Sequence, residues 1–224
     1  MNLAAPRVDI GLHTNNLDAM LAFWQGEVGA EFKEALPIRP GMTQYRHDVN
    51  GSVLKINHHS ASLPTTPPAG YRELLIARNG LTAVKQLKDP DENLVSLVPS
   101  MDNMSQIGVR LYVRDCDVHR RFYSGVLGLR ESSPGSFHAG DSALFFTKSA
   151  DAVTDASFEG KGWRYITFQV FKVDEEHAGI LALGGREALA PVTLGKTARI
   201  SMIRDPDGNW IEISQRASIV GPLS

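Results

Sequence analysis

The sequence predicts an α+β fold with mostly antiparallel sheets, made of two tandem copies of one module. The first observation is a repeated turn and strand: Asp89–Leu97 returns as Asp205–Ile213, each an Asp-Pro-Asp turn followed by an alternating apolar strand. The second is a matching strand and helix start, since residues 12–29 resemble residues 111–128. We therefore divide the chain into two similar domains. The boundaries that we predict are residues 7–99 and 106–216.

The first elements of each copy have clear local signals. Each copy begins with alternating apolar residues, continues with Asn16 or Asp115 as a helix cap, and reaches a glycine that ends the helix. Asn50-Gly51 and Gly140-Asp141 then form two-residue hairpin turns between strand-like runs. The order predicted for the second copy is strand, helix and three strands, followed by strand, helix and further strands.

The second copy is the longer one. Its extra residues include Val173–Gly184, whose apolar spacing favours a short helix ended by glycine. The first copy has only Ala77–Lys88 at this place, which is too short for a helix and a strand, so it is predicted to be a trimmed version of the second. Long loops at residues 61–70 and 151–162 lie at matching places and could cover a site.

Balanced charge and the near absence of cysteine limit the function. The 224 residues include 23 Lys and Arg against 25 Asp and Glu, with no basic cluster, which argues against nucleic acid or an anionic membrane as a partner. The single Cys116 excludes a disulfide framework and a cysteine-rich zinc site. No signal peptide or long apolar span is recognisable. We therefore expect a cytoplasmic protein whose partner is a small molecule.

Strand alternation predicts which side chains of the first copy face a cleft. If Asn50-Gly51 is a two-residue turn, Arg46 pairs with Lys55, and paired residues share a face. The opposite face carries more apolar side chains and is expected to pack on the helix of residues 17–24. The face left for the cleft is polar. It comprises Gln44, Arg46, Asp48, Val53, Lys55 and Asn57, joined by Asp9, Gly11 and His13 of the first strand.

In the second copy the same alternation predicts an aromatic wall with a few polar groups, the usual composition of a small-molecule pocket. Trp163 lies next to this wall and could cap an aromatic ligand. Filling of an apolar core is the alternative role for the aromatic residues. The predicted wall consists of Arg110, Tyr112, His138, Phe145, Thr147, Tyr165, Thr167, Gln169, Trp210 and Glu212.

Four pieces of the second copy follow one another in a recognisable order. They are Arg114-Asp115 before a helix, Phe122-Tyr123 within it, the run Val126–Leu129, and the turn and strand Arg204–Ile213. Together they resemble the vicinal oxygen chelate superfamily, which includes glyoxalase I, bleomycin-resistance proteins and extradiol dioxygenases. The resemblance implies paired βαβββ modules whose curved sheets form a cleft, with helices on the convex side and ligand on the concave side. It does not determine the reaction.

The resemblance also implies where a metal ion would be held. Metal-binding members use four concave positions, which in the second copy fall on Gly108, Phe145, Tyr165 and Glu212. In the first copy they fall on Asp9, Lys55, Glu73 and Ser96. Only Asp9, Glu73 and Glu212 could ligate a divalent ion, and the Lys55 ammonium would repel one. We therefore expect no metal or other cofactor at these positions.

The sequence thus favours a small-molecule enzyme of this superfamily with a degenerate metal site. It would move a proton on a small substrate, for which the aromatic wall suggests an aromatic compound, as a lyase, isomerase or hydrolase does. The predicted acid–base residues are Glu212, His138 and Lys55. The predicted substrate contacts are Arg110, Tyr112, Phe145, Trp163, Tyr165, Gln169 and Trp210.

Other interpretations remain open. Glu212 and Lys55 could belong to structural ion pairs, with Arg110 for the former and Asp9 or Glu73 for the latter. The chain could be a non-catalytic protein that sequesters an aromatic compound, as bleomycin-resistance relatives do. It could also be a divalent-metal enzyme with unusual ligands, such as His13, His47 or His138 with Asp9, Glu73 or Glu212. A homodimer is expected because the trimmed first copy would expose a sheet edge.

Overall fold

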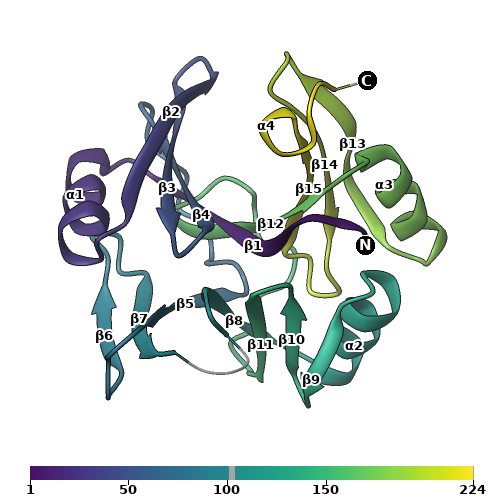
Figure 1. Cartoon of the computed structure of the whole chain (residues 1–224), viewed down its shortest axis with the longest axis horizontal. Helices are drawn as coiled ribbons and strands as arrows, with labels where there is room; N and C mark the ends of the chain where they lie inside the picture. The colour runs from purple at the N-terminus through teal and green to yellow at the C-terminus, as the bar shows by residue number, and fades with distance from the viewer. Residues whose placement is uncertain (101–103, 224) are drawn as a thin grey trace.

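The computed structural model describes residues 1–100 and 104–223, which fold into two curved sheets with helices beside them (Figure 1). We name the sheets the first and the second. The first sheet, in the described residues, is made of β1 (Leu3–Thr14), β2 (Glu31–Arg39), β3 (Met42–Val49), β4 (Ser52–His59), β12 (Gly162–Val170), β13 (Arg186–Leu194), β14 (Ala198–Arg204) and β15 (Trp210–Arg216). Its strand order is β13-β14-β15-β12-β1-β4-β3-β2.

The second sheet contains the middle of the chain. Within the described residues it is made of β5 (Tyr71–Arg78), β6 (Lys85–Lys88), β7 (Leu94–Pro99), β8 (Ile107–Val113), β9 (Arg130–Ser133), β10 (Ser136–Ala139) and β11 (Ser142–Lys148). Its strand order is β6-β7-β5-β8-β11-β10-β9. The predicted α+β class, with curved sheets from repeated βαβββ modules, is confirmed.

Each sheet combines strands from both sequence copies. β1 pairs with β4 on one side and with β12 on the other, so the N-terminal strand joins the C-terminal part of the chain. In the second sheet β5 pairs with β8. The expectation that each copy forms its own cleft is therefore wrong, because an alternating strand can pair with either copy without changing its buried face. The boundaries 7–99 and 106–216 describe the repeat in the sequence, and the sheets do not follow them.

Short helices follow the strands at matching places. α1 (Leu17–Ala22) continues into the wider turn η1 (Phe23–Glu27), and α2 (Cys116–Arg120) continues into η2 (Arg121–Val126). The chain also forms α3 (Val173–Ala182) and α4 (Ala217–Val220). Asp115 caps α2 as predicted, since its carboxylate accepts hydrogen bonds from two helix N–H groups. Asn16 does not cap α1; instead its own N–H donates to Thr14 Oγ1, which stabilises the turn before the helix.

The predicted turns and the trimming of the first copy are confirmed. Val49 pairs with Ser52 across the first hairpin, and Ala139 pairs with Ser142 across the second. α3 lies where the sequence predicts the extra helix of the second copy. Residues 77–88, all described, contain a turn and β6 but no helix.

One apolar core joins the two sheets to the helices. It includes Ile10 of β1, Ile76 of β5 and Val109 of β8, together with Trp24 of η1 and Phe122 of η2. The apolar faces predicted from alternation are thus buried against each other, which leaves the polar face of the first sheet free to form a cavity. No helix in the described part of the chain is long and apolar enough to cross a membrane.

Candidate active site

A cavity of about 540 Å³ lies on the concave face of the first sheet. Its floor comes from β4, β12 and β15, and its sides come from the two edges of the sheet, β2 on one side and β13 with β14 on the other. The polar floor includes Lys55, Asn57, Tyr165, Gln169 and Glu212. The apolar sides include Leu36, Met42, Phe158, Ile200 and Met202. Its size and mixed lining suit a small organic molecule.

The long loop before β12 covers part of the cavity, as its position in the sequence predicted. Phe158 and Glu159 of this loop line the cavity, and Glu159 forms an ion pair with Arg39 of β2. The loop is held by Arg164, a buried residue whose guanidinium donates hydrogen bonds to backbone carbonyls on both long loops. Burial lowers the pKa of Arg164 to about 10. The loop is therefore fixed to the sheet beneath it.

Strand register brings the polar floor together. Asp9 on β1 lies opposite Thr167 on β12, which lies beside Glu212 on β15. Two residues along the strands, Gly11 lies between Tyr165 and Lys55. Residues in register on neighbouring strands share a face, so these side chains converge.

A missing side chain in β1 makes room for an aromatic ring. A Cβ on Gly11 would lie 2.2 Å from ring atoms of Tyr165, far inside van der Waals contact. The ring of Tyr165 therefore crosses β1 at the only residue type that leaves the space open. Its hydroxyl thereby reaches the floor of the cavity, where Gln44 and Asn57 lie.

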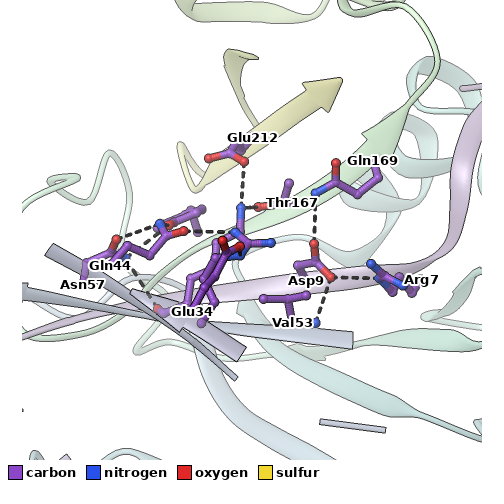
Figure 2. Close-up of polar contacts among 12 residues, drawn as sticks. Arg7, Asp9, Glu34, Gln44, Val53, Asn57, Thr167, Gln169 and Glu212 are labelled. Carbon is purple, nitrogen blue, oxygen red and sulfur yellow. Dashed lines mark hydrogen bonds and ion pairs between the residues drawn. The ribbon is translucent and has the colours of Figure 1, made fainter. Parts of the chain in front are cut away.

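The centre of the floor is a buried ion pair between Lys55 and Glu212. Lys55 Nζ lies 2.7 Å from Glu212 Oε1 and 2.7 Å from Thr167 Oγ1, and the two charged side chains are 3% and 11% exposed. In Figure 2 the dashed lines from the Glu212 carboxylate and from the Thr167 hydroxyl meet at one nitrogen atom, which is Lys55 Nζ. Burial lowers the pKa of Lys55, and the charge of Glu212 opposes that shift without cancelling it. The pair thus holds an ammonium and a carboxylate in reach of a bound molecule.

Tyr165 can donate a hydrogen bond into the cavity. Its hydroxyl oxygen accepts hydrogen bonds from Asn57 Nδ2 at 3.1 Å and from Gln44 Nε2 at 3.3 Å. Burial raises the pKa of Tyr165, so the phenol stays protonated. Because both protein contacts use the oxygen as acceptor, the hydroxyl hydrogen is available to a ligand.

The carboxylate of Asp9 is occupied by hydrogen bonds from three neighbouring groups. Its carboxylate accepts hydrogen bonds from Val53 N at 2.9 Å, Gln169 Nε2 at 3.0 Å and Arg7 Nε at 3.2 Å, and its side chain is fully buried (Figure 2). The other end of the Gln169 amide differs, since Oε1 is buried with no partner among the described residues. Gln169 lines the cavity, but this oxygen is enclosed, so the amide acts in the site through its hydrogen bond to Asp9.

Two arginines line the cavity above the floor. Arg46 comes from β3 and Arg216 from the end of β15, with side chains 7% and 13% exposed. Both guanidinium groups contact Glu34 of β2, and Arg46 Nη1 also donates to Gln44 Oε1 at 3.0 Å. Burial, and to a lesser extent the charge of Arg46, lower the pKa of Arg216. Glu34 is therefore the carboxylate that offsets two nearly buried positive charges.

The residues at the implied ligand positions do not fit a divalent metal ion. The pairing of β1 and β4 with β12 and β15 collects Asp9, Lys55, Tyr165 and Glu212 into one site. The Lys55 ammonium already contacts the Glu212 carboxylate, and the Asp9 oxygens are engaged by three donors. In the described chain no group of three or more His, Cys, Asp or Glu side chains could hold a metal ion. The donor set is that of a charge pair with a phenol beside it.

Several predicted site residues lie in the second sheet, away from this cavity. His138 is on β10, Arg110 and Tyr112 are on β8, and Phe145 is on β11. Arg110 Nε lies 2.7 Å from Glu73, so the interpretation of an Arg110–Glu212 pair is wrong, as is that of a Lys55–Glu73 pair. The physical reason is the exchange of strands between copies, which separates β8 and β11 from β15.

The two tryptophans predicted to contact substrate, Trp163 and Trp210, pack against other parts of the protein instead. Trp163 is buried on the opposite face of β12, with its ring 5.9 Å from that of Trp24. Trp210 donates from Nε1 to Ala156 O at 2.8 Å and stacks under Arg204, 3.8 Å from the ring centroid. Neither ring lines the cavity. The structure therefore brings together Lys55, Tyr165, Gln169 and Glu212 of the predicted set.

The sequence interpretation missed Glu34, Phe158 and Arg216. Arg216 is four residues after Glu212 on the same strand and so shares its face, a signal that alternation could have supplied. Glu34 follows a register irregularity in β2, which disturbs the alternation. Phe158 lies in a loop, where no periodicity applies.

Comparison with known proteins identifies the family. Residues 104–213 match the family described as the Glyoxalase/Bleomycin resistance protein/Dioxygenase superfamily. The match lies in the second sequence copy, and it confirms the resemblance inferred from the sequence. No curated protein matches the chain.

Solved structures extend the likeness to almost the whole chain. Glyoxalase I from Zea mays superposes with a TM-score of 0.75 at 16% sequence identity, covering 93% of this chain and 92% of that one. A putative dioxygenase from Bacillus subtilis subsp. subtilis str. 168 superposes with a TM-score of 0.70 at 12% identity, covering 96% and 85%. Identities this low show a common fold, and one fold supports several reactions.

Proposed function

We propose that this chain is a small-molecule enzyme whose Lys55–Glu212 pair moves a proton, as an isomerase, lyase or hydrolase does. The observation that carries the proposal is an ammonium and a carboxylate 2.7 Å apart on the floor of a cavity of about 540 Å³. Their burial strengthens their interaction with any charge that develops on a ligand. A cytoplasmic location is part of the proposal, supported by the free Cys116.

The pair suits chemistry beside a carbonyl group. Glu212 accepts a proton from the carbon next to the carbonyl, the electron pair of that C–H bond forms a carbon–carbon double bond, and the π pair of the carbonyl moves onto its oxygen. Lys55 donates a hydrogen bond to the resulting oxyanion, which replaces part of its contact with Glu212. Glu212 then returns the proton to the product. Tyr165 orients the substrate through its hydroxyl hydrogen, which no protein group in the described chain accepts.

Proton exchange tests this proposal without a known natural substrate. Small carbonyl compounds and phenols are incubated with the protein in D₂O, and replacement of C–H by C–D is followed by NMR. For a compound that exchanges, Glu212→Gln should slow exchange by about 100-fold or more while leaving its affinity nearly unchanged. Lys55→Met should also slow exchange, because the oxyanion loses its donor.

The second sheet offers a matched control. Glu73 is a buried carboxylate paired with Arg110 at 2.7 Å, yet it lies outside the cavity. Glu73→Gln should therefore keep the exchange activity. Equal losses in the Glu73 and Glu212 variants would mean that the loss reflects stability, and the proposal would be abandoned.

A sequestering protein is the second candidate. The observation that favours it is the mutual neutralisation of Lys55 and Glu212, which a purely structural ion pair would also show. In that case a compound would bind in the cavity and the wild-type protein would exchange none of its protons, with or without Glu212.

A further inference from the structure

The two cavity arginines share a single partner that comes from outside the cavity floor. Glu34 Oε1 lies 2.6 Å from Arg216 Nη2 and 3.2 Å from Arg46 Nε. The same oxygen atom therefore serves two guanidinium groups, while each guanidinium could engage two oxygens of an anion. Oε2 of Glu34 accepts no hydrogen bond from the described residues, whereas Oε1 accepts one from Arg216. The single Glu34 carboxylate therefore leaves hydrogen-bond donors of the two guanidinium groups available to another anion.

Burial differs sharply among the three residues. The arginine side chains are 7% and 13% exposed, whereas Glu34 is 41% exposed. Two nearly buried cations that face each other need an anion, because unpaired buried charge is costly. Glu34 lies on β2, the outermost strand of its side of the sheet, where its carboxylate can turn into water at little cost. An anion inside the cavity would therefore compete well with it.

The surroundings of the arginines define the rest of the ligand. Apolar side chains of β2, β3 and β14 form the sides of the same cavity, among them Leu36, Met42, Ile200 and Met202. The Lys55–Glu212 pair lies on its floor. A molecule with an acid group at one end can therefore contact the arginines while its apolar part packs on these sides.

We propose that Arg46 and Arg216 bind an oxyanion of the substrate, a carboxylate or a phosphate, and that Glu34 competes with this group for the same two guanidiniums. The substrate class is thus a small acid with an apolar body. That the bound acid is a substrate rests on the proposed function. The anion-binding site itself rests on the geometry of Glu34, Arg46 and Arg216. Glu34 then acts as an internal competitor that sets the affinity for acids.

Calorimetric titration of the whole chain tests this inference with three related compounds. They are phenylpropionate, phenethyl phosphate and phenylpropionamide, which share an apolar body and differ in charge. Glu34→Gln should tighten binding of at least one acid by about tenfold, the value of one charge-assisted contact, and leave binding of the amide unchanged. Which acid responds distinguishes carboxylate from phosphate recognition.

Asp174 supplies the matched control. It is an exposed carboxylate that pairs with Arg199 of β14, and neither residue lines the cavity. Asp174→Asn should leave all three affinities unchanged. Arg216→Gln and Arg46→Gln should each abolish the preference for acid over amide, and thermal unfolding confirms that these variants are folded.

The inference is overturned if neither acid binds the Glu34→Gln variant, or if the acids bind wild type and this variant equally. Its failure is separable from failure of the proposed function. Acid binding that responds to Glu34, with proton exchange that ignores Glu212, would keep the anion site and refute the enzyme. Exchange that needs Glu212, with acid binding indifferent to Glu34, would do the reverse.

Discussion

Replacing Lys55 with methionine removes the only cation that contacts the Glu212 carboxylate in the described structure. The two side chains are 3% and 11% exposed, so the carboxylate that remains is nearly buried and unpaired. Breaking a buried ion pair by removing one partner costs about 3 to 5 kcal/mol. Glu212 faces a cavity that water can enter, so we expect the lower end, a loss of about 3 kcal/mol in the free energy of unfolding.

A double variant separates the interaction energy of the Lys55–Glu212 pair from the contributions of the two side chains alone. Lys55→Met combined with Glu212→Gln leaves no charge unpaired, so its stability should recover by at least about half of the single loss. Urea unfolding followed by tryptophan fluorescence measures both, with the slope of the transition checked for constancy. In a chain of 224 residues the single loss corresponds to a fall in Tm of about 6 to 12 °C.

Two outcomes would refute this reasoning. A loss below about 1 kcal/mol in Lys55→Met would mean that the ion pair is solvated, like a surface pair. Simple addition of the two single losses in the double variant would mean that Lys55 and Glu212 do not interact in the folded protein.

Four further predictions concern other features of the chain. Gly11→Ala should cost about 1 to 3 kcal/mol, because its Cβ would lie 2.2 Å from the Tyr165 ring, whereas Gly26→Ala meets nothing within 4 Å and should be tolerated in the same urea assay. Burial, with a smaller contribution from His59, lowers the pKa of His13 to about 3. The unfolded chain therefore takes up this proton first as pH falls below 6.5, so wild type should lose about 2 kcal/mol more than His13→Gln between pH 7 and pH 5. Elemental analysis of protein purified without chelator should find iron, manganese, nickel and zinc far below one per chain; a full equivalent would restore the metal-enzyme interpretation. Sedimentation should find a homodimer, and a monomer at high concentration would contradict that expectation.

Alternation along single strands predicted much of the site. It placed Gln44, Arg46, Lys55 and Asn57 on a polar face of the first copy, and all four line the cavity. The same reasoning placed Tyr165, Gln169 and Glu212 on one face of the second copy. A period of two needs only local sequence, because each strand alternates whatever lies beside it.

Strand pairing could not be predicted in the same way. Lys55 and Glu212 were assigned to separate clefts, although β1 and β12 unite them in one. His138 was assigned with Glu212, although its strand lies in the other sheet. Which strand pairs with which depends on contacts between residues far apart in the chain. The alternating sequence of one strand does not show which strand will lie beside it.

The position of β12 between β1 and β15 ties the cavity to the completion of the chain. Lys55 and Glu212 are separated by 157 positions, so neither has its charge partner until β15 has been synthesised and placed. Contacts this distant in sequence form slowly, because a long loop must close first. Until then the polar face of β1 and β4 is exposed to water. A truncated or nicked chain that lacks its last strand would therefore lose the binding cavity even where its remaining modules fold.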